Sequence, residues 1–145
     1  MRLSTKGRYA VMAMADLARR ENEAVRAVAL ADIAQRQEIS LSYLEQLFAR
    51  LRRKGLVQSA RGPGGGYRLA RAAEATTIAE IVHAVDEPLR ATRCTTPGKG
   101  CMLKGERCLT HDLWEDLGQQ IETYLASVSL ADVIGGRLGD RRQAA

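Results

Sequence analysis

The sequence predicts a mainly α-helical protein with a small β-hairpin wing: a winged helix-turn-helix domain followed by a long C-terminal helix. Two observations indicate this fold. Short amphipathic segments are followed by two strand-like segments on either side of Gly62-Pro63-Gly64-Gly65-Gly66. A longer amphipathic pattern then covers residues 110–128. With 145 residues, of which 46% are apolar, the chain can form one domain with an appendage.

The first two helices are expected at residues 5–20 and 30–37. Ser4 or Thr5 can cap the first helix, whose apolar residues recur on one face. The polar stretch 21–26 is expected to be a turn. The second helix is short, so together with the helix that follows it forms a helix-turn-helix candidate.

The third helix is expected to begin after Ser40, run to Lys54 and end at Gly55. At about 100° per residue, its apolar residues form one arc: Leu41, Leu44, Leu47, Phe48 and Leu51. The opposite face is polar at its N-terminal end and cationic at the other end. This arrangement is typical of a recognition helix, whose first residues reach base edges while Lys and Arg neutralise phosphates. For a single helix, a solvated surface is the commoner explanation of such a face.

Residues 56–61 and 67–71 are expected to be strands joined by the glycine-rich turn. A hairpin directly after a candidate recognition helix is a wing. Arg61 and Arg68 flank its tip, and an arginine there can enter a narrow minor groove. The turn is not a Walker loop, because no Gly-Lys-Ser/Thr follows it.

Beyond the wing, Thr77 and Glu80 form a capping-box pattern for a helix to about Asp86, with His83 expected on its solvated face. Residues 87–109 lose all periodicity. The amphipathic segment 110–128 is expected to be one long helix, whose apolar stripe could pack on its own domain or on a second copy. A short helix ended by Gly135-Gly136 would follow.

Charge divides the chain into a basic front and a slightly acidic back. Residues 1–75 hold 14 Lys/Arg and 7 Asp/Glu, whereas residues 76–145 hold 8 and 10. A basic front half indicates a polyanionic partner such as nucleic acid, and the alternative that charge leaves open is a basic soluble protein without one. With no signal-peptide pattern and no apolar run long enough for a membrane span, we expect a cytoplasmic protein with reduced thiols and no membrane partner.

The three cysteines form the arrangement Cys94-x6-Cys101-x6-Cys108-x2-His111. Three thiolates and an imidazole suit zinc or an iron–sulfur cluster. Structural zinc sites usually hold ligands in close pairs, so the long gaps modestly favour a cluster. The remaining alternative is three reduced surface thiols. No paired acid and base, nucleophile motif or dinucleotide fingerprint is present, so an enzyme is not expected.

Several segments resemble the IscR-like winged-helix regulators. They are the opening residues 1–11, the block 39–48, the wing sequence 61–67, and the cysteine segments Ala91-Thr92-Arg93-Cys94 and Cys108-Leu109-Thr110-His111. The resemblance covers about residues 1–135. It implies a homodimeric DNA-binding regulator, mainly a repressor, of genes for iron–sulfur cluster assembly. Occupancy by a 2Fe–2S cluster would change which promoters it binds, and the cluster assembly machinery would donate the cluster.

Carried onto this chain, the resemblance implies cluster ligands at Cys94, Cys101, Cys108 and His111. It implies DNA contacts from Ser40, Ser42, Tyr43, Glu45, Gln46 and Arg50, with Arg61 in the minor groove. Related branches that sense nitric oxide or iron use other cysteine spacings, and both inter-cysteine loops here are one residue longer than in the best-known branch. A 4Fe–4S regulator and a winged-helix protein with structural zinc therefore remain alternatives.

The expected organisation has four parts. The DNA-binding domain occupies residues 1–86 and the cluster-binding loop 87–109. A dimerisation helix region follows at 110–135, and a flexible tail at 136–145.

Overall fold

The computed structural model describes residues 4–24, 26–85 and 100–143. Most of the described chain is helical, and its one sheet is a two-stranded antiparallel hairpin. In chain order the elements are α1 (Thr5–Ala24), α2 (Leu30–Gln37), α3 (Leu41–Arg53), β1 (Val57–Ala60), β2 (Gly66–Leu69), the 3-10 helix η1 (Ala73–Ala75), α4 (Ile78–Val85), α5 (His111–Ser127), α6 (Leu130–Ile134) and α7 (Leu138–Gln143).

The helix starts confirm the capping signals in the sequence. Ser40 Oγ accepts from the Tyr43 amide at 3.2 Å, which caps α3. Thr77 and Glu80 form a reciprocal capping box on α4, with bonds of 2.9 and 3.2 Å. Gly55, with φ of +75°, follows α3 as expected.

α1 is one turn longer than expected, because residues 21–24 continue the helix. The reason is a contact that the local sequence does not show. The Glu21 carboxylate accepts a 2.9 Å hydrogen bond from the Leu69 amide on β2. Glu21 thereby joins the end of α1 to the wing.

The hairpin is anchored along β2 by a third backbone segment. Within the hairpin, Val57 pairs with Leu69 and Ala60 with Gly66. Val28 then bridges Tyr67 through amide–carbonyl bonds of 2.9 and 2.8 Å. β2 is therefore held by backbone pairing on both sides, with β1 on one and Val28 on the other.

An ion pair fixes α2 against α1. The Arg36 guanidinium binds the buried Asp16 carboxylate bidentately, with its shortest contact at 2.6 Å, and Gln37 adds a 2.9 Å bond. Burial alone would raise the pKa of Asp16. The bonds from Arg36 and Gln37, together with the charge of Arg36, outweigh burial and hold that pKa below its usual value.

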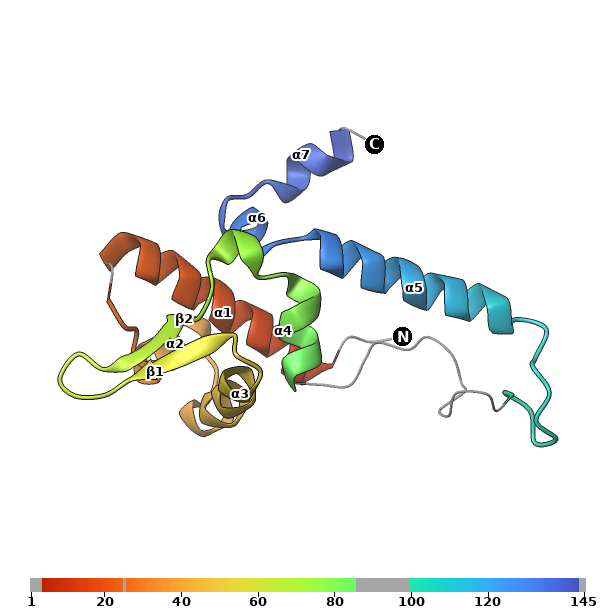
Figure 1. Ribbon diagram of the computed structural model, residues 1–145, viewed down its shortest axis with the longest axis horizontal. Helices are drawn as coiled ribbons and strands as arrows, with labels where there is room; N and C mark the ends of the chain where they lie inside the picture. Colours follow the sequence, from red (N-terminus) through yellow and green to blue (C-terminus); the bar gives the residue numbers. More distant parts are fainter. Residues whose placement is uncertain (1–3, 25, 86–99, 144–145) are drawn as a thin grey trace.

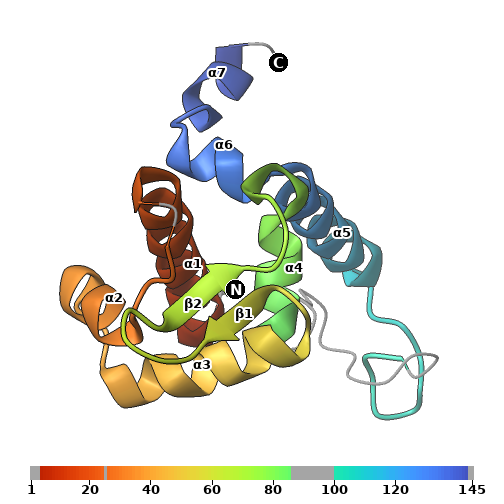
Figure 2. The same ribbon diagram turned by 60° about the vertical axis from the view of Figure 1, so that its left-hand side comes forward.

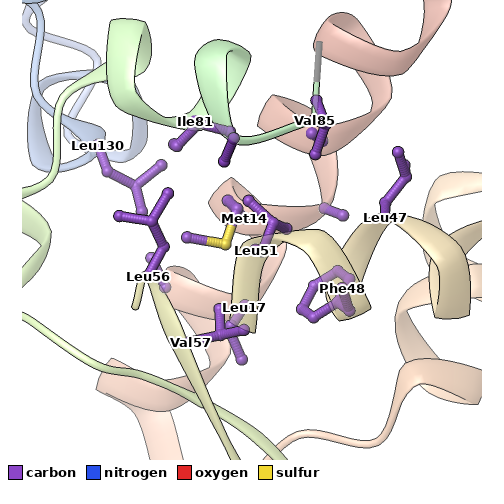
Figure 3. Close-up of a cluster of buried hydrophobic side chains, with 14 of the residues drawn as sticks. Met14, Leu17, Leu47, Phe48, Leu51, Leu56, Val57, Ile81, Val85 and Leu130 are labelled. Atoms are coloured by element: carbon purple, nitrogen blue, oxygen red, sulfur yellow. The ribbon is translucent and has the colours of Figure 1, made fainter. Parts of the chain in front are cut away.

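The core lies where α1, α3 and α4 meet, with the base of the hairpin beside it (Figure 3). α3 contributes four buried residues: Leu44, Leu47, Phe48 and Leu51. Leu41 differs from the expectation, since its side chain is 42% exposed. It stands in the first turn of α3, beyond the edge of this core.

α5 leaves this body as a long rod, and the chain returns to the core after it (Figure 1). Val128 and Leu130 are buried, and the backbone at Ser129 bridges Thr77. Residues 128–134 thus pack with the helix-turn-helix elements, although the sequence grouped them with the dimerisation helix. In the expected flexible tail, residues 138–143 form α7, and Leu138 packs against the core.

Candidate nucleic-acid interface and cysteine–histidine site

α3 presents a polar face beside the hairpin, as a recognition helix requires. Ser40, Ser42, Glu45 and Gln46 are all exposed. Figure 2 shows α2 and α3 in succession, with the hairpin running alongside α3. Four of the expected DNA-contacting residues therefore stand on one accessible surface next to the wing.

Two other expected contact residues have partners within the protein. Tyr43 is half-buried and packs edge-on against Tyr9, with ring centroids 5.9 Å apart. Arg50 Nη1 donates a 2.7 Å hydrogen bond to the Val85 carbonyl at the end of α4. The Arg50 side chain thus ties α3 to α4.

The wing is coupled to the recognition helix through an aromatic contact. Tyr67 on β2 meets Phe48 on α3 with ring centroids 5.0 Å apart and planes at 64°. Arg61 and Arg68 are exposed beside the wing tip, as expected. This contact fixes the wing and its arginines relative to α3.

Part of the predicted ligand set converges at the first residue of α5. Cys101 Sγ lies 2.9 Å from His111 Nδ1. The His111 side chain is buried, with 8% of the residue exposed. Cys108 is linked through the backbone, because its carbonyl accepts from the His111 amide at 3.1 Å, and its sulfur lies 3.7 Å from Thr110 Oγ1. Cys94, the fourth expected ligand, lies outside the described residues.

The loop that carries these cysteines is closed by a turn. Met102 donates its amide to the Glu106 carbonyl at 3.0 Å, and Gly105 donates to Met102 at 2.9 Å. Gly105 has φ of +83°, and a Cβ on Gly100 would meet the Gly105 carbonyl oxygen at 2.2 Å. Glycine at both positions allows the backbone to close between the two cysteines.

The donor chemistry fits a soft or borderline metal centre. The Cys101 thiol and the His111 ring nitrogen lie at hydrogen-bonding distance, so two candidate metal ligands are already close together. The other ring nitrogen of His111 lies 3.3 Å from the Glu115 carboxylate, one turn along α5. A carboxylate in that position orients the ring, as partners of metal-binding histidines do.

Some contacts at these sites had no sequence signal. Glu21 and Tyr67 act on residues distant in the chain. His83 is exposed as expected but also binds Glu122 on α5, with Nε2 2.9 Å from Oε1. Only Glu115 could have been found, because an acidic residue four positions after a histidine shares its helix face.

Comparison with known proteins decides the family. Residues 3–136 match the Rrf2 family, described as an iron-dependent transcriptional regulator. The chain belongs to the Rrf2 family. The relatives described next carry the name IscR, which confirms the resemblance found in the sequence.

Two Rrf2 relatives show how close the match is. The HTH-type transcriptional regulator IscR of Xenorhabdus nematophila is 56% identical over 134 residues, covering 92% of this chain and 79% of that protein. IscR of Escherichia coli O1:K1 is 51% identical, covering 94% of this chain and 82% of that protein.

Solved structures agree with this family assignment. T. potens IscR has a TM-score of 0.76 at 36% identity, covering 97% of this chain and 90% of that one. CymR, the global cysteine regulator of B. subtilis, has a TM-score of 0.78 at 32% identity, covering 93% of this chain and 97% of that one.

Membership of Rrf2 confirms three expectations. The fold is a winged helix, the protein is a DNA-binding transcriptional regulator, and the named relatives are regulators rather than enzymes. Within the part of the chain that the structure describes, no helix is both long and apolar enough to cross a bilayer.

Proposed function

We propose that this Rrf2 protein is a homodimeric regulator, mainly a repressor, of iron–sulfur cluster assembly genes. A 2Fe–2S cluster held by Cys94, Cys101, Cys108 and His111 governs which promoters it binds. The observation that carries the proposal is the 2.9 Å approach of Cys101 Sγ to His111 Nδ1. The names of the IscR relatives support the same assignment.

The protein's part in this chemistry is to present the donors and keep them in place. When bound, the cluster supplies a centre that responds to iron, sulfide and oxidants. His111 would hold the cluster through a ring nitrogen. Glu115 orients the ring from the opposite side. Because His111 is the first residue of α5, a bound cluster would join the cysteine loop to the helix proposed as the dimer seam.

DNA binding is proposed to place α3 in the major groove and Arg61 in the adjacent minor groove. Ser40, Ser42, Glu45 and Gln46 are exposed on the side of α3 that would meet base edges and phosphates. The exposed Leu41 adds an apolar group of the kind that contacts a thymine methyl. In a dimer, two such surfaces would read a palindrome with half-sites about 34 Å apart.

The proposed partners follow from this mechanism. They are promoter DNA, a second copy of the chain, and the iron–sulfur assembly machinery as the cluster donor. The proposed location is the cytoplasm, because promoter DNA lies in the cytoplasm of the bacteria that carry these relatives.

The first experiment measures iron, acid-labile sulfide and zinc per chain, with a visible spectrum, on protein purified without oxygen. The expected result is about two irons and two sulfides per chain with thiolate-to-iron absorption. Four of each would indicate a 4Fe–4S regulator. One zinc in a colourless protein would leave the DNA-binding assignment and overturn cluster sensing.

Matched variants then test the ligand assignment. Cys101→Ala and His111→Ala should lose the cluster, whereas Met102→Ala, an exposed change in the same loop, should retain it. Promoter binding is compared for cluster-loaded and cluster-free protein. Equal affinity for every promoter in both forms would contradict gating.

A further inference from the structure

α5 is joined to the DNA-binding domain at its C-terminal end, and Gly118 in the middle of the helix is also buried. Among the described elements it packs mainly against α4. Its attachment point is a backbone bridge, where Ile78 donates to the Val128 carbonyl at 2.9 Å and Leu130 donates to Thr76 at 2.8 Å. The other end of the rod points away from the body in Figure 1. A tilt of this rod, the lever of the argument below, would therefore have its pivot, or hinge, at residues 128–130.

One side-chain contact between α5 and α4 lies beyond that hinge. His83 Nε2 on α4 is 2.9 Å from Glu122 Oε1 and 3.0 Å from Glu122 Oε2. At 1.5 Å per residue, Glu122 is about 9 Å from Val128 along the helix, and His111 is about 25 Å from it. The contact thus holds the lever at roughly one-third of its length. Leu125, between the hinge and Glu122, packs partly against the core.

The consequence for a dimer is geometric. A rotation of about 10° at the hinge moves the α5 tip by about 4 Å over that length. This displacement exceeds the 3.4 Å rise between successive base pairs. If two protomers join through α5, the lever angle sets the separation of their recognition helices.

We propose that His83 and Glu122 are positioning residues that set the half-site spacing this regulator accepts. The inference rests on the proposed homodimer that binds palindromic DNA. Neither residue is among those proposed to contact DNA or to hold the cluster. It acts by fixing the angle of α5 on α4. Both side chains are partly exposed, at 38% and 36%, so the contact can open and close without disturbing the core.

The test uses full-length protein and a series of palindromes whose half-sites are moved apart or together by one base pair at a time. Affinities are measured by fluorescence anisotropy for wild type, His83→Ala, Glu122→Ala and the double variant. The control is Gln119→Ala, an exposed change on the same helix. Protein stability and dimer dissociation are measured alongside.

Wild type should prefer one spacing. Each single variant should reduce the ratio of affinities between the best and the neighbouring spacings by about three- to fivefold, the effect expected from losing one partly exposed hydrogen bond. The double variant should reduce this affinity ratio no further than either single variant does, because the two substitutions remove the same interaction. Gln119→Ala should leave the ratio unchanged, and His83→Lys, which can still pair with Glu122, should restore it.

An unchanged ratio in the alanine variants, or a loss of affinity equal at every spacing, would overturn the positioning role. Absence of any spacing preference in a dimeric wild type would also overturn it, since no spacing would then be set. Failure of the wild type to dimerise or to bind palindromes would instead overturn the proposed function. The two failures are therefore distinguishable.

Discussion

Glu45 is the acidic residue of α3, and it is exposed among the expected DNA contacts. A carboxylate accepts from a cytosine amino group, but phosphates and base acceptors repel it. Glu45→Ala should therefore reduce discrimination between promoter sites while overall affinity stays equal or rises. Competition binding against a library of half-site variants measures this. Unchanged selectivity would show that Glu45 does not narrow sequence choice.

Arg50 illustrates how a contact within the protein changes the expected role of a side chain. Its bond to the Val85 carbonyl indicates that it orients α3 rather than neutralising a phosphate. Arg50→Gln should weaken DNA binding with little change in the salt dependence of affinity. Arg53→Gln, on the exposed cationic face, should lower the logarithmic salt slope by about 0.9. An equal drop in the logarithmic salt slope for Arg50→Gln would show that Arg50 contacts a phosphate.

Asp16 gives the protein an acid-sensitive contact within the helix-turn-helix. Its pKa is lower in the folded protein than its ordinary value of 3.8. The stabilisation is therefore complete above about pH 5 and is lost as the pH falls through the folded-state pKa. Asp16→Asn should cost about 2 kcal/mol at pH 7.

Urea unfolding of wild type and Asp16→Asn between pH 7 and pH 3 tests this. The stability difference should shrink as the carboxylate of the wild type becomes protonated. A difference that stays constant across that range would mean that packing, and not charge, accounts for the effect.

The wing depends on a close backbone approach at Gly66. A Cβ there would lie 2.2 Å from the Val28 carbonyl oxygen, which the bridge to Tyr67 holds in place. Gly66→Ala should cost about 1–3 kcal/mol and weaken DNA binding by displacing the wing. Denaturant unfolding and promoter affinity measure both effects.

The matched control is Gly139→Ala on α7, where nothing lies within 4 Å of the added carbon. That change should be neutral or stabilise the protein by up to about 1 kcal/mol. If Gly66→Ala behaves like the control, β2 is able to move away from Val28 without loss of stability or DNA affinity.

As a whole, the single chain leaves the apolar stripe of α5 largely uncovered. Leu113, Trp114 and Tyr124 are 59%, 40% and 55% exposed, respectively. An apolar stripe of this length is typical of a helix that packs against a second copy. Leu113→Glu combined with Tyr124→Glu should convert a dimer to a monomer, as measured by analytical ultracentrifugation.

The control for this prediction is Gln119→Glu, which adds charge on the polar side of α5. It should leave the dimer intact. The monomeric variant should also lose at least tenfold in affinity for palindromic DNA, because each half-site would then bind alone. A double variant that remains dimeric would place the seam elsewhere.

Local patterns were sufficient for most elements of this fold. The caps at Ser40 and Thr77, the periodicity of α2 to α5 and the glycine-rich turn all act through neighbours within a few residues. Such signals can therefore be found from the sequence alone. The Cys–His spacing likewise predicts a metal-binding segment, because the types of candidate ligand and their order can be read directly from the sequence.

Contacts between distant residues required the tertiary structure. Glu21 lengthens α1 by binding β2, Arg50 is held by α4, and residues 128–134 join the core of the first domain. The meeting of Cys101 with His111 also depends on how the loop closes. Secondary structure and donor chemistry follow from local sequence, whereas helix ends, side-chain partners and the angle of α5 depend on packing between segments far apart in the chain.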